Sequence, residues 1–197
     1  MVTAPDTRYR ISAEQFLAMV ESGILPAKPR LELLRGELWR IPVQTPLHRA
    51  LVVLLHDALL ERYPFGPFHV AARSTIWALP DSLPEPDLAV VRGDAELFLQ
   101  RLPRPEDTVL VGEVVVTTMA VAREKAGLYA EAGFPLYLLV DAVRRTCDVY
   151  SEPGPDGYRL TRHHAVGDPM ALPEARAPLD LGEVFPAAAS EPVADQA

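Results

Sequence analysis

The sequence predicts an α/β or α+β domain in which a mixed β-sheet is flanked by helices. Three observations support this fold class. The run 109–116 is rich in valine and long enough for a buried central strand. Segments with the apolar spacing of helices lie before and after it. Shorter apolar runs bounded by glycine and proline supply further strands.

A chain of 197 residues suits a single domain with a sizeable core. We expect this domain to span residues 1–185, since no internal repeat or long linker divides them. The segment 186–197 (PAAASEPVADQA) has no apolar face, and we expect it to be a disordered tail.

Composition limits the functional classes. The hydrophobic content of 49% and the charged content of 23% are ordinary for a soluble protein. No apolar run is long enough to span a membrane, and the first residues lack the apolar core of a signal peptide. The single cysteine, Cys147, excludes an internal disulfide and fits a cytoplasmic location. The net charge of −8 opposes a general electrostatic grip on nucleic acid, so such a partner would need a local basic patch.

The first third of the chain predicts two helices and a hairpin. A capping-box pattern at Ser12 opens a helix that ends near Gly23. Residues 31–41 (LELLRGELWRI) form two short strands around an Arg-Gly turn. Thr45, followed by proline, begins a long helix that runs to about Tyr63.

The middle of the chain alternates strands with proline-rich loops. We predict a strand at 68–79, a loop at 80–86 and a short strand at 87–91 with its acid at the entrance. A polar, proline-broken segment then leads into the central strand.

A helix follows the central strand. Thr117 or Thr118 caps its start, and Gly133 stops it after Ala132. Three further strands are predicted at 136–141, at 146–151 and near 158–161.

Two acids and a lysine form the candidate site. Glu113 stands in the middle of the central strand, where an unpaired carboxylate costs several kcal/mol. Asp87 enters the preceding strand, and Lys125 lies about two turns into the following helix. Two carboxylates on neighbouring strands suit Mg²⁺, with the Val114 carbonyl as a further ligand. Taken alone, the spacing of these three residues favours structural ion pairs over a metal site. Pro-Asp is a common turn dipeptide, so its presence here does not mark a metal ligand.

Lys125 is one of two lysines in a chain with seventeen arginines. Lysine carries a compact charge on a flexible stem, unlike the planar guanidinium of arginine. A lysine beside a metal-bound phosphate could orient water or stabilise negative charge. The alternative is a salt-bridged lysine on the helix surface.

Five segments in order carry a family resemblance: LELLRGEL (31–38), TPLH (45–48), PEPDLAVV (84–91), LVGEVV (110–115) and EKAGLYAEAGFPLYLLVD (124–141). Together they resemble the Uma-type family of putative endonucleases, a family of unknown function in the restriction-endonuclease-like PD-(D/E)xK superfamily. The resemblance implies a restriction-endonuclease-like mixed sheet flanked by helices.

The resemblance also implies the roles of the site residues. Asp87 and Glu113 would hold Mg²⁺ or Mn²⁺, with Glu32 as a third carboxylate. The superfamily's usual lysine position is Val115 here, and Lys125 matches a lysine relocated to the following helix. His48 and Gln44 would touch substrate or support the metal ligands. Alternatively, Glu32 is an exposed acid on an edge hairpin and His48 only packs.

The sequence thus predicts a metal-dependent nuclease that hydrolyses DNA phosphodiester bonds, with RNA as a further possible substrate. A homodimer is plausible, since this superfamily often cuts two strands with two copies. One rival is a non-catalytic module that binds nucleic acid or protein on the same fold. Another is an enzyme acting on a small phosphate-bearing substrate.

Overall fold

The computed structural model of the protein describes residues 8–26, 28–117 and 119–185. Within these residues the helices are α1 (Ala13–Glu21), α2 (Pro46–Arg62) and α3 (Met119–Ala132), with short 3₁₀ helices η1 (Ala95–Phe98) and η2 (Pro105–Asp107). The strands are β1 (Leu31–Leu34), β2 (Glu37–Arg40), β3 (Phe68–Ala72), β4 (Leu88–Arg92), β5 (Thr108–Val115), β6 (Leu136–Asp141), β7 (Thr146–Ser151) and β8 (Leu160–Ala165).

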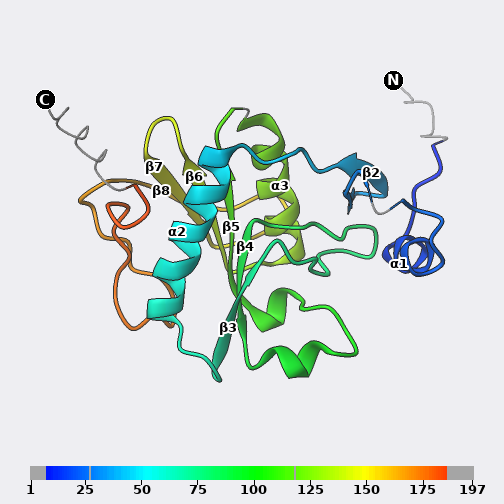
Figure 1. Ribbon diagram of the computed structural model, residues 1–197, viewed down its shortest axis with the longest axis horizontal. Helices are drawn as coiled ribbons and strands as arrows, with labels where there is room; N and C mark the ends of the chain where they lie inside the picture. Colours follow the sequence, from blue (N-terminus) through cyan, green and yellow to red (C-terminus); the bar gives the residue numbers. More distant parts are fainter. Residues whose placement is uncertain (1–7, 27, 118, 186–197) are drawn as a thin grey trace, which may run out of the picture.

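Strands β3 to β8 form one sheet in the order β3-β4-β5-β6-β7-β8 (Figure 1). All neighbours are antiparallel except β5 and β6, which are parallel and are joined through α3. A parallel pair needs such a crossover connection. The predicted mixed sheet flanked by helices is therefore confirmed.

The two long helices cover opposite faces of this sheet. Side chains of a buried strand point alternately to its two faces. Leu110 of β5 belongs to the core under α2, together with Leu55. Val111 belongs to the core under α3, together with Tyr129. The valine-rich central strand is buried on both sides for this reason, as the sequence predicted.

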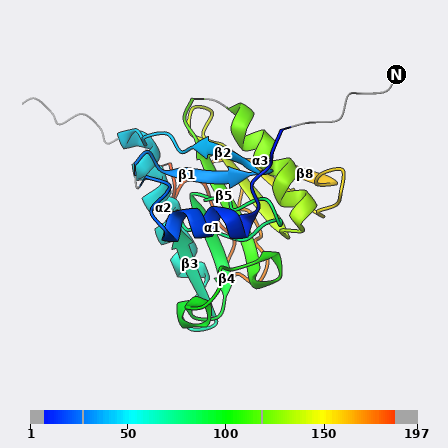
Figure 2. The same ribbon diagram turned by 90° about the vertical axis from the view of Figure 1, so that its right-hand side faces the viewer.

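The β1–β2 hairpin and α1 lie together at one side of the sheet domain (Figure 2). The turn of the hairpin has positive φ at Arg35 (51°) and Gly36 (76°), which suits a two-residue turn. The Leu33 N–H and carbonyl bridge to Leu83, and the Arg35 N–H donates to Ser82 Oγ at 2.8 Å. These bonds fasten the hairpin to the loop that precedes β4.

The predicted helix boundaries hold closely. Ser12 forms a capping box with Gln15, and Thr45 accepts from the His48 N–H at 3.2 Å. Gly133, with φ of 87°, ends α3. Thr118, one of the two predicted caps of α3, lies outside the described residues, as does the predicted tail 186–197.

Two predicted strands have different limits. The strand predicted at 68–79 ends at Ala72, because the following backbone turns away from β4 and bonds to loops: the Trp77 N–H donates to the Pro103 carbonyl. The strand predicted near 158–161 runs from Leu160 to Ala165. Among the helices that the structure describes, none combines the length and the apolar character needed to cross a bilayer.

Candidate active site

All six residues predicted for the site line a single cavity of about 440 Å³. The cavity lies among the β1–β2 hairpin, the segment leading into α2, the adjoining ends of β4 and β5, and α3. The six are Glu32, Gln44, His48, Asp87, Glu113 and Lys125. Residues from five separate segments therefore converge, as the site prediction requires.

Asp87 and Glu113 stand where the β4–β5 ladder ends. The last paired residues are Leu88 and Gly112, so Asp87 and Glu113 are the next residues on their strands. Like charges in neighbouring positions of paired strands repel each other. Both carboxylates therefore need cations or hydrogen-bond donors beside them.

Asp87 is held by donors from two elements. Its Oδ2 accepts from the Val114 N–H at 3.0 Å and from His48 Nε2 at 3.0 Å. Its Oδ1 lies 3.5 Å from Gln44 Nε2, at the limit of a hydrogen bond. Because β4 starts only at Leu88, the Val114 N–H has no β4 partner and is left for the Asp87 carboxylate.

Glu113 meets a cation and a hydroxyl. Its Oε1 accepts from Lys125 Nζ at 2.9 Å and from the Tyr129 hydroxyl at 3.2 Å. The side chain is 12% exposed. Burial raises the pKa of this carboxyl to about 7, since the opposing effect of Lys125 is smaller than the cost of desolvation, and Asp87 adds to the rise.

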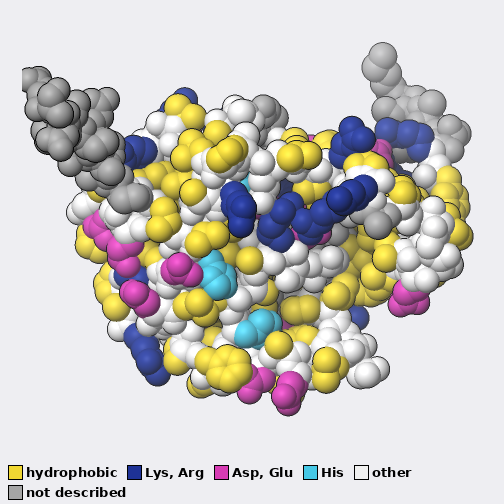
Figure 3. Space-filling model, viewed as in Figure 1, with side chains coloured by type: hydrophobic (Ala, Val, Ile, Leu, Met, Phe, Trp, Pro, Cys, Tyr) yellow, Lys and Arg dark blue, Asp and Glu magenta, His cyan; other side chains and the backbone are white. Residues whose placement is uncertain are grey.

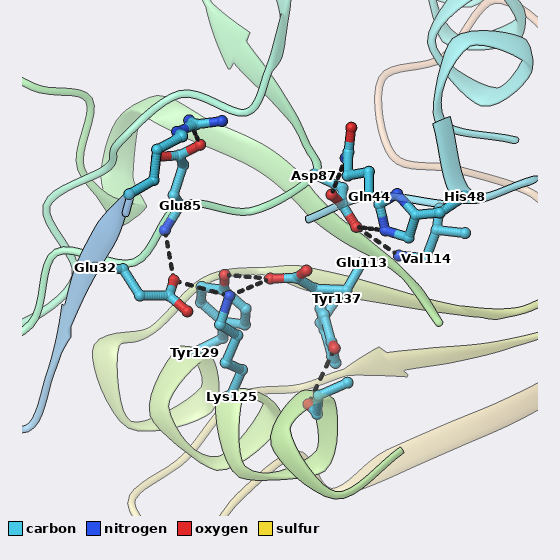
Figure 4. Close-up of polar contacts among 12 residues, drawn as sticks. Glu32, Gln44, His48, Glu85, Asp87, Glu113, Val114, Lys125, Tyr129 and Tyr137 are labelled. Carbon is cyan, nitrogen blue, oxygen red and sulfur yellow. Dashed lines mark hydrogen bonds and ion pairs between the residues drawn. The ribbon is translucent and has the colours of Figure 1, made fainter. Parts of the chain in front are cut away.

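Lys125 bridges two acids. Its Nζ lies 2.9 Å from Glu113 Oε1 and 2.9 Å from Glu32 Oε2, with only 7% of the side chain exposed. Burial lowers the pKa of the ammonium, but the two carboxylates raise it more, so its pKa lies above the usual value. Figure 4 shows this group beside the group around Asp87. Lys125 thus reaches the predicted acid, and the surface-lysine alternative is wrong.

Glu32 is buried, with 6% of its surface exposed. Its Oε2 also accepts from the Glu85 N–H at 3.0 Å, which fixes it against the loop before β4. Burial raises the pKa of this carboxyl despite its contact with Lys125. The alternative interpretation of Glu32 as an exposed acid is therefore wrong, because the hairpin packs inward against this loop.

His48 lies in the first turn of α2, where the Thr45 cap orients it toward Asp87. The hydrogen bond to the Asp87 carboxylate raises the pKa of the imidazole. Because that carboxylate accepts, Nε2 carries the hydrogen. Nδ1 is buried and has no hydrogen-bond partner among the described residues. His48 therefore contacts a proposed metal ligand rather than only packing.

The donor set fits a divalent cation that prefers oxygen. Three nearly buried carboxylates gather at this cavity: Glu32 and Glu113 pair with the Lys125 ammonium, and Asp87 pairs with His48. No group of three or more His, Cys, Asp or Glu side chains in the described part of the chain is spaced to hold a metal. Asp87 and Glu113 alone would suit Mg²⁺, which is usually bound by one or two carboxylates and keeps several waters.

A backbone carbonyl is available beside these acids. The Val115 carbonyl accepts from the Ala142 N–H on the β6 side. Polar backbone groups of successive strand residues point to opposite edges. The Val114 carbonyl, like the Val114 N–H, therefore faces the Asp87 side, as the sequence prediction of a third protein ligand requires.

Sequence reasoning missed three residues that face the cavity or its acids. Tyr129 donates to Glu113 but was not among the predicted site residues, although it stands four residues after Lys125 and so shares its helix face. Arg40 and Arg73 also line the cavity. Nothing in the local pattern marks them, since the strand predicted through Arg73 gave no reason for it to face the acids.

Comparisons with known proteins agree with the observed fold. A crystal structure described as a putative nuclease belonging to DUF820 from Anabaena variabilis superposes with a TM-score of 0.71. It is 16% identical and covers 89% of this chain and 97% of that chain, which shows a shared fold. No curated protein matches. The model of the Uma2 family, described as "putative restriction endonuclease", matches residues 13–181, and the chain belongs to this family.

Proposed function

We propose that the protein is a divalent-metal-dependent nuclease that hydrolyses phosphodiester bonds of DNA. The observation that carries this proposal is the convergence of Asp87, Glu113 and Lys125 on one cavity, with their side chains nearly buried. Family membership and the nuclease-like fold support it. The metal dependence and the role of each residue are our proposal.

Asp87, Glu113 and the Val114 carbonyl would hold Mg²⁺ or Mn²⁺. The bound cation would supply a nucleophilic water at neutral pH and neutralise charge on the phosphate. The hydrogen bonds from Val114 and His48 to Asp87 Oδ2 leave Oδ1 as the freer oxygen of that carboxylate. His48 and Gln44 therefore serve to orient Asp87.

Lys125 would act as a charged hydrogen-bond donor. Its raised pKa keeps the ammonium protonated at neutral pH, so it does not serve as a general base. From its place beside Glu113 it would stabilise negative charge developing on the phosphate. Glu32 is held by Lys125 and the Glu85 N–H, so we assign it to positioning the lysine rather than to the metal.

A cleavage assay tests this function. Plasmid DNA, single-stranded DNA and single-stranded RNA are incubated with the protein in Mg²⁺, in Mn²⁺ and in EDTA. We expect DNA cleavage that needs the metal and is lost in Asp87→Asn and Glu113→Gln. Glu124→Gln, which changes an exposed acid next to Lys125 on α3, is the matched control and should cleave normally. DNA binding without cleavage under any of these metals would instead support a non-catalytic module on this fold.

A further inference from the structure

Three features of the cavity bear on the form of its substrate. The acids and the lysine are recessed, the walls carry arginines that have no acidic partner among the described residues, and exposed apolar side chains line the same cavity. Each feature restricts the shape or the chemistry of a nucleic acid that could reach Glu113.

The reacting phosphate has to enter the cavity. Asp87, Glu113 and Lys125 have only 7 to 12% of their side chains exposed, so a phosphate resting on the outer surface would not reach them. A DNA duplex is stiff, with a persistence length of about 50 nm, and holds its phosphates on a convex cylinder. An unpaired strand bends within a few bonds. The volume of about 440 Å³ suits one nucleotide rather than a segment of double helix.

Arg40 and Arg73 supply positive charge in the lining of the cavity. Both line the cavity, and neither guanidinium group makes a hydrogen bond or an ion pair with the described residues. Figure 3 shows Lys and Arg side chains gathered in a row across this face of the molecule. In a chain with a net charge of −8, unpartnered guanidinium groups beside a cavity provide the local basic patch that phosphates require.

The backbone of Arg73 is held in an unusual conformation. Its φ is 52°, in the left-handed region that a bulky residue rarely adopts. Its N–H donates to the Asp87 carbonyl at 3.0 Å, so Arg73 is tied directly to a proposed metal ligand. Burial and the positive charge of Arg73 together lower the pKa of Arg30, which shows that two guanidinium groups lie near each other here. Arg30 is already paired with Glu85, so Arg73 is the guanidinium of this pair that is left to bind an anion.

The same cavity has an apolar part. Val43 is 97% exposed, Val121 is 39% exposed, and Trp39 is half-buried, and all three line the cavity. The outer surface of a duplex presents phosphates and sugars, and its bases are stacked inside. An unpaired strand exposes base faces that pack on apolar and aromatic side chains.

We propose that this cavity takes an unpaired nucleic-acid strand, with Arg40 and Arg73 binding phosphates next to the one that reacts and Trp39, Val43 and Val121 contacting bases. This inference rests on the proposed nuclease function and names the substrate form of the same site. It predicts a preference for single strands, frayed ends or flaps over intact duplex.

A binding assay in EDTA, where no cleavage is expected, tests this inference. A labelled oligonucleotide is titrated with the full chain in EDTA, by fluorescence anisotropy, as a single strand and annealed to its complement. We expect the single strand to bind about tenfold more tightly, as one stacked base contributes about that factor. Inorganic phosphate at matched ionic strength should not displace it. Equal or tighter binding of the duplex, or displacement by phosphate alone, overturns the inference.

The salt dependence of strand binding tests whether Arg40 and Arg73 bind phosphates. The Arg40→Gln/Arg73→Gln double variant should lower the slope of log affinity against log salt by about 1.4, because each phosphate that an arginine neutralises on a single strand accounts for about 0.7 of that slope. Arg162→Gln changes an exposed arginine on β8, far along the sheet, and should leave the slope unchanged. Val43→Ser should weaken single-strand binding without changing the slope. An unchanged slope in the double variant contradicts the assignment of the two arginines.

The outcomes separate this inference from the proposed function. Strand binding as described, without cleavage in Mg²⁺ or Mn²⁺, removes the nuclease function and leaves the strand site standing. Cleavage of intact duplex that is unaffected in the double variant leaves the nuclease function standing and overturns the strand site.

Discussion

The Lys125 ammonium lies 2.9 Å from Glu32 Oε2, although the two residues come from α3 and from the hairpin outside the main sheet. The same nitrogen lies 2.9 Å from Glu113 Oε1 in the central strand. One buried cation thus neutralises acids from two separate layers. The position of the hairpin and the geometry of the candidate site therefore depend on each other.

Removing the Lys125 charge should destabilise the fold. Lys125→Met leaves two buried carboxylates facing each other, and breaking a buried ion pair in this way costs about 3–5 kcal/mol. Urea denaturation measures the loss. Adding Glu32→Gln to Lys125→Met should recover part of it, because one of the unpaired charges is removed. Lys28→Met, at the only other lysine, is exposed and should change stability by less than about 0.5 kcal/mol. A Lys125→Met protein as stable as the wild type would contradict the buried bridge.

His48 should control metal affinity through Asp87. His48→Gln removes the imidazole that bonds Asp87 Oδ2 at 3.0 Å, and loss of such a supporting hydrogen bond typically weakens metal binding by about 10- to 100-fold. Calorimetric titration with Mn²⁺ measures this. His56→Gln is the matched control on the same helix, since within the described part of the chain His56 pairs only with the exposed Asp57. Equal losses in both variants would show that the effect comes from the helix and not from Asp87.

Two buried tyrosines allow a hydrogen bond in the candidate site to be compared with one in the core. The Tyr129 hydroxyl donates to Glu113 Oε1, whereas the Tyr137 hydroxyl donates to the Ala122 carbonyl at 3.0 Å. Either change to Phe should cost about 1 kcal/mol of stability, the usual value of one hydrogen bond. Only Tyr129→Phe should also alter Mn²⁺ affinity. A change in Mn²⁺ affinity in Tyr137→Phe of the same size would remove the distinction.

Stability without metal should fall as pH rises toward neutrality. Glu113 has a pKa of about 7 in the folded protein and an ordinary value of 4.5 when unfolded. Between these values the folded protein binds more protons than the unfolded chain, so the free energy of unfolding decreases with increasing pH. Titration of Glu113 therefore lowers the free energy of unfolding by about 3 kcal/mol as the pH rises from below 4.5 to above 7.

The measurement is denaturation in EDTA at about pH 5 and about pH 8, for the wild type and Glu113→Gln. The variant lacks the titrating group, so its stability relative to the wild type should increase between the two pH values. Glu124→Gln controls for the general effect of removing an acid from this region. A wild-type-to-variant difference that is the same at both pH values would show that Glu113 titrates normally.

The sequence predicted elements whose signals are local. The valine-rich run, the caps at Ser12 and Thr45 and the stop at Gly133 depend on a few adjacent residues, and each is found where expected. The strand predicted through 79 was too long because Ile76 and Trp77 are apolar yet bond to loops. Apolar spacing reports burial, and it does not report which backbone a strand pairs with.

The residues predicted for the candidate site lie in one cavity, but the contacts among them were not predicted. Family resemblance named Glu32 as a metal ligand, whereas the structure pairs it with Lys125. That pairing depends on the hairpin bonding to the loop at Leu83, a long-range event without a local signature. The cavity-facing position of Arg73 likewise depends on its bond to the Asp87 carbonyl.

The most direct test of the account is a crystal of the full chain soaked in Mn²⁺, with the metal located by anomalous scattering. We expect one site bound by Asp87 and Glu113 at roughly 2.0–2.2 Å, as for a hard divalent cation, with Lys125 still beside Glu113. Metal bound elsewhere, or a cavity that takes no Mn²⁺ while both carboxylates keep their present contacts, would contradict it.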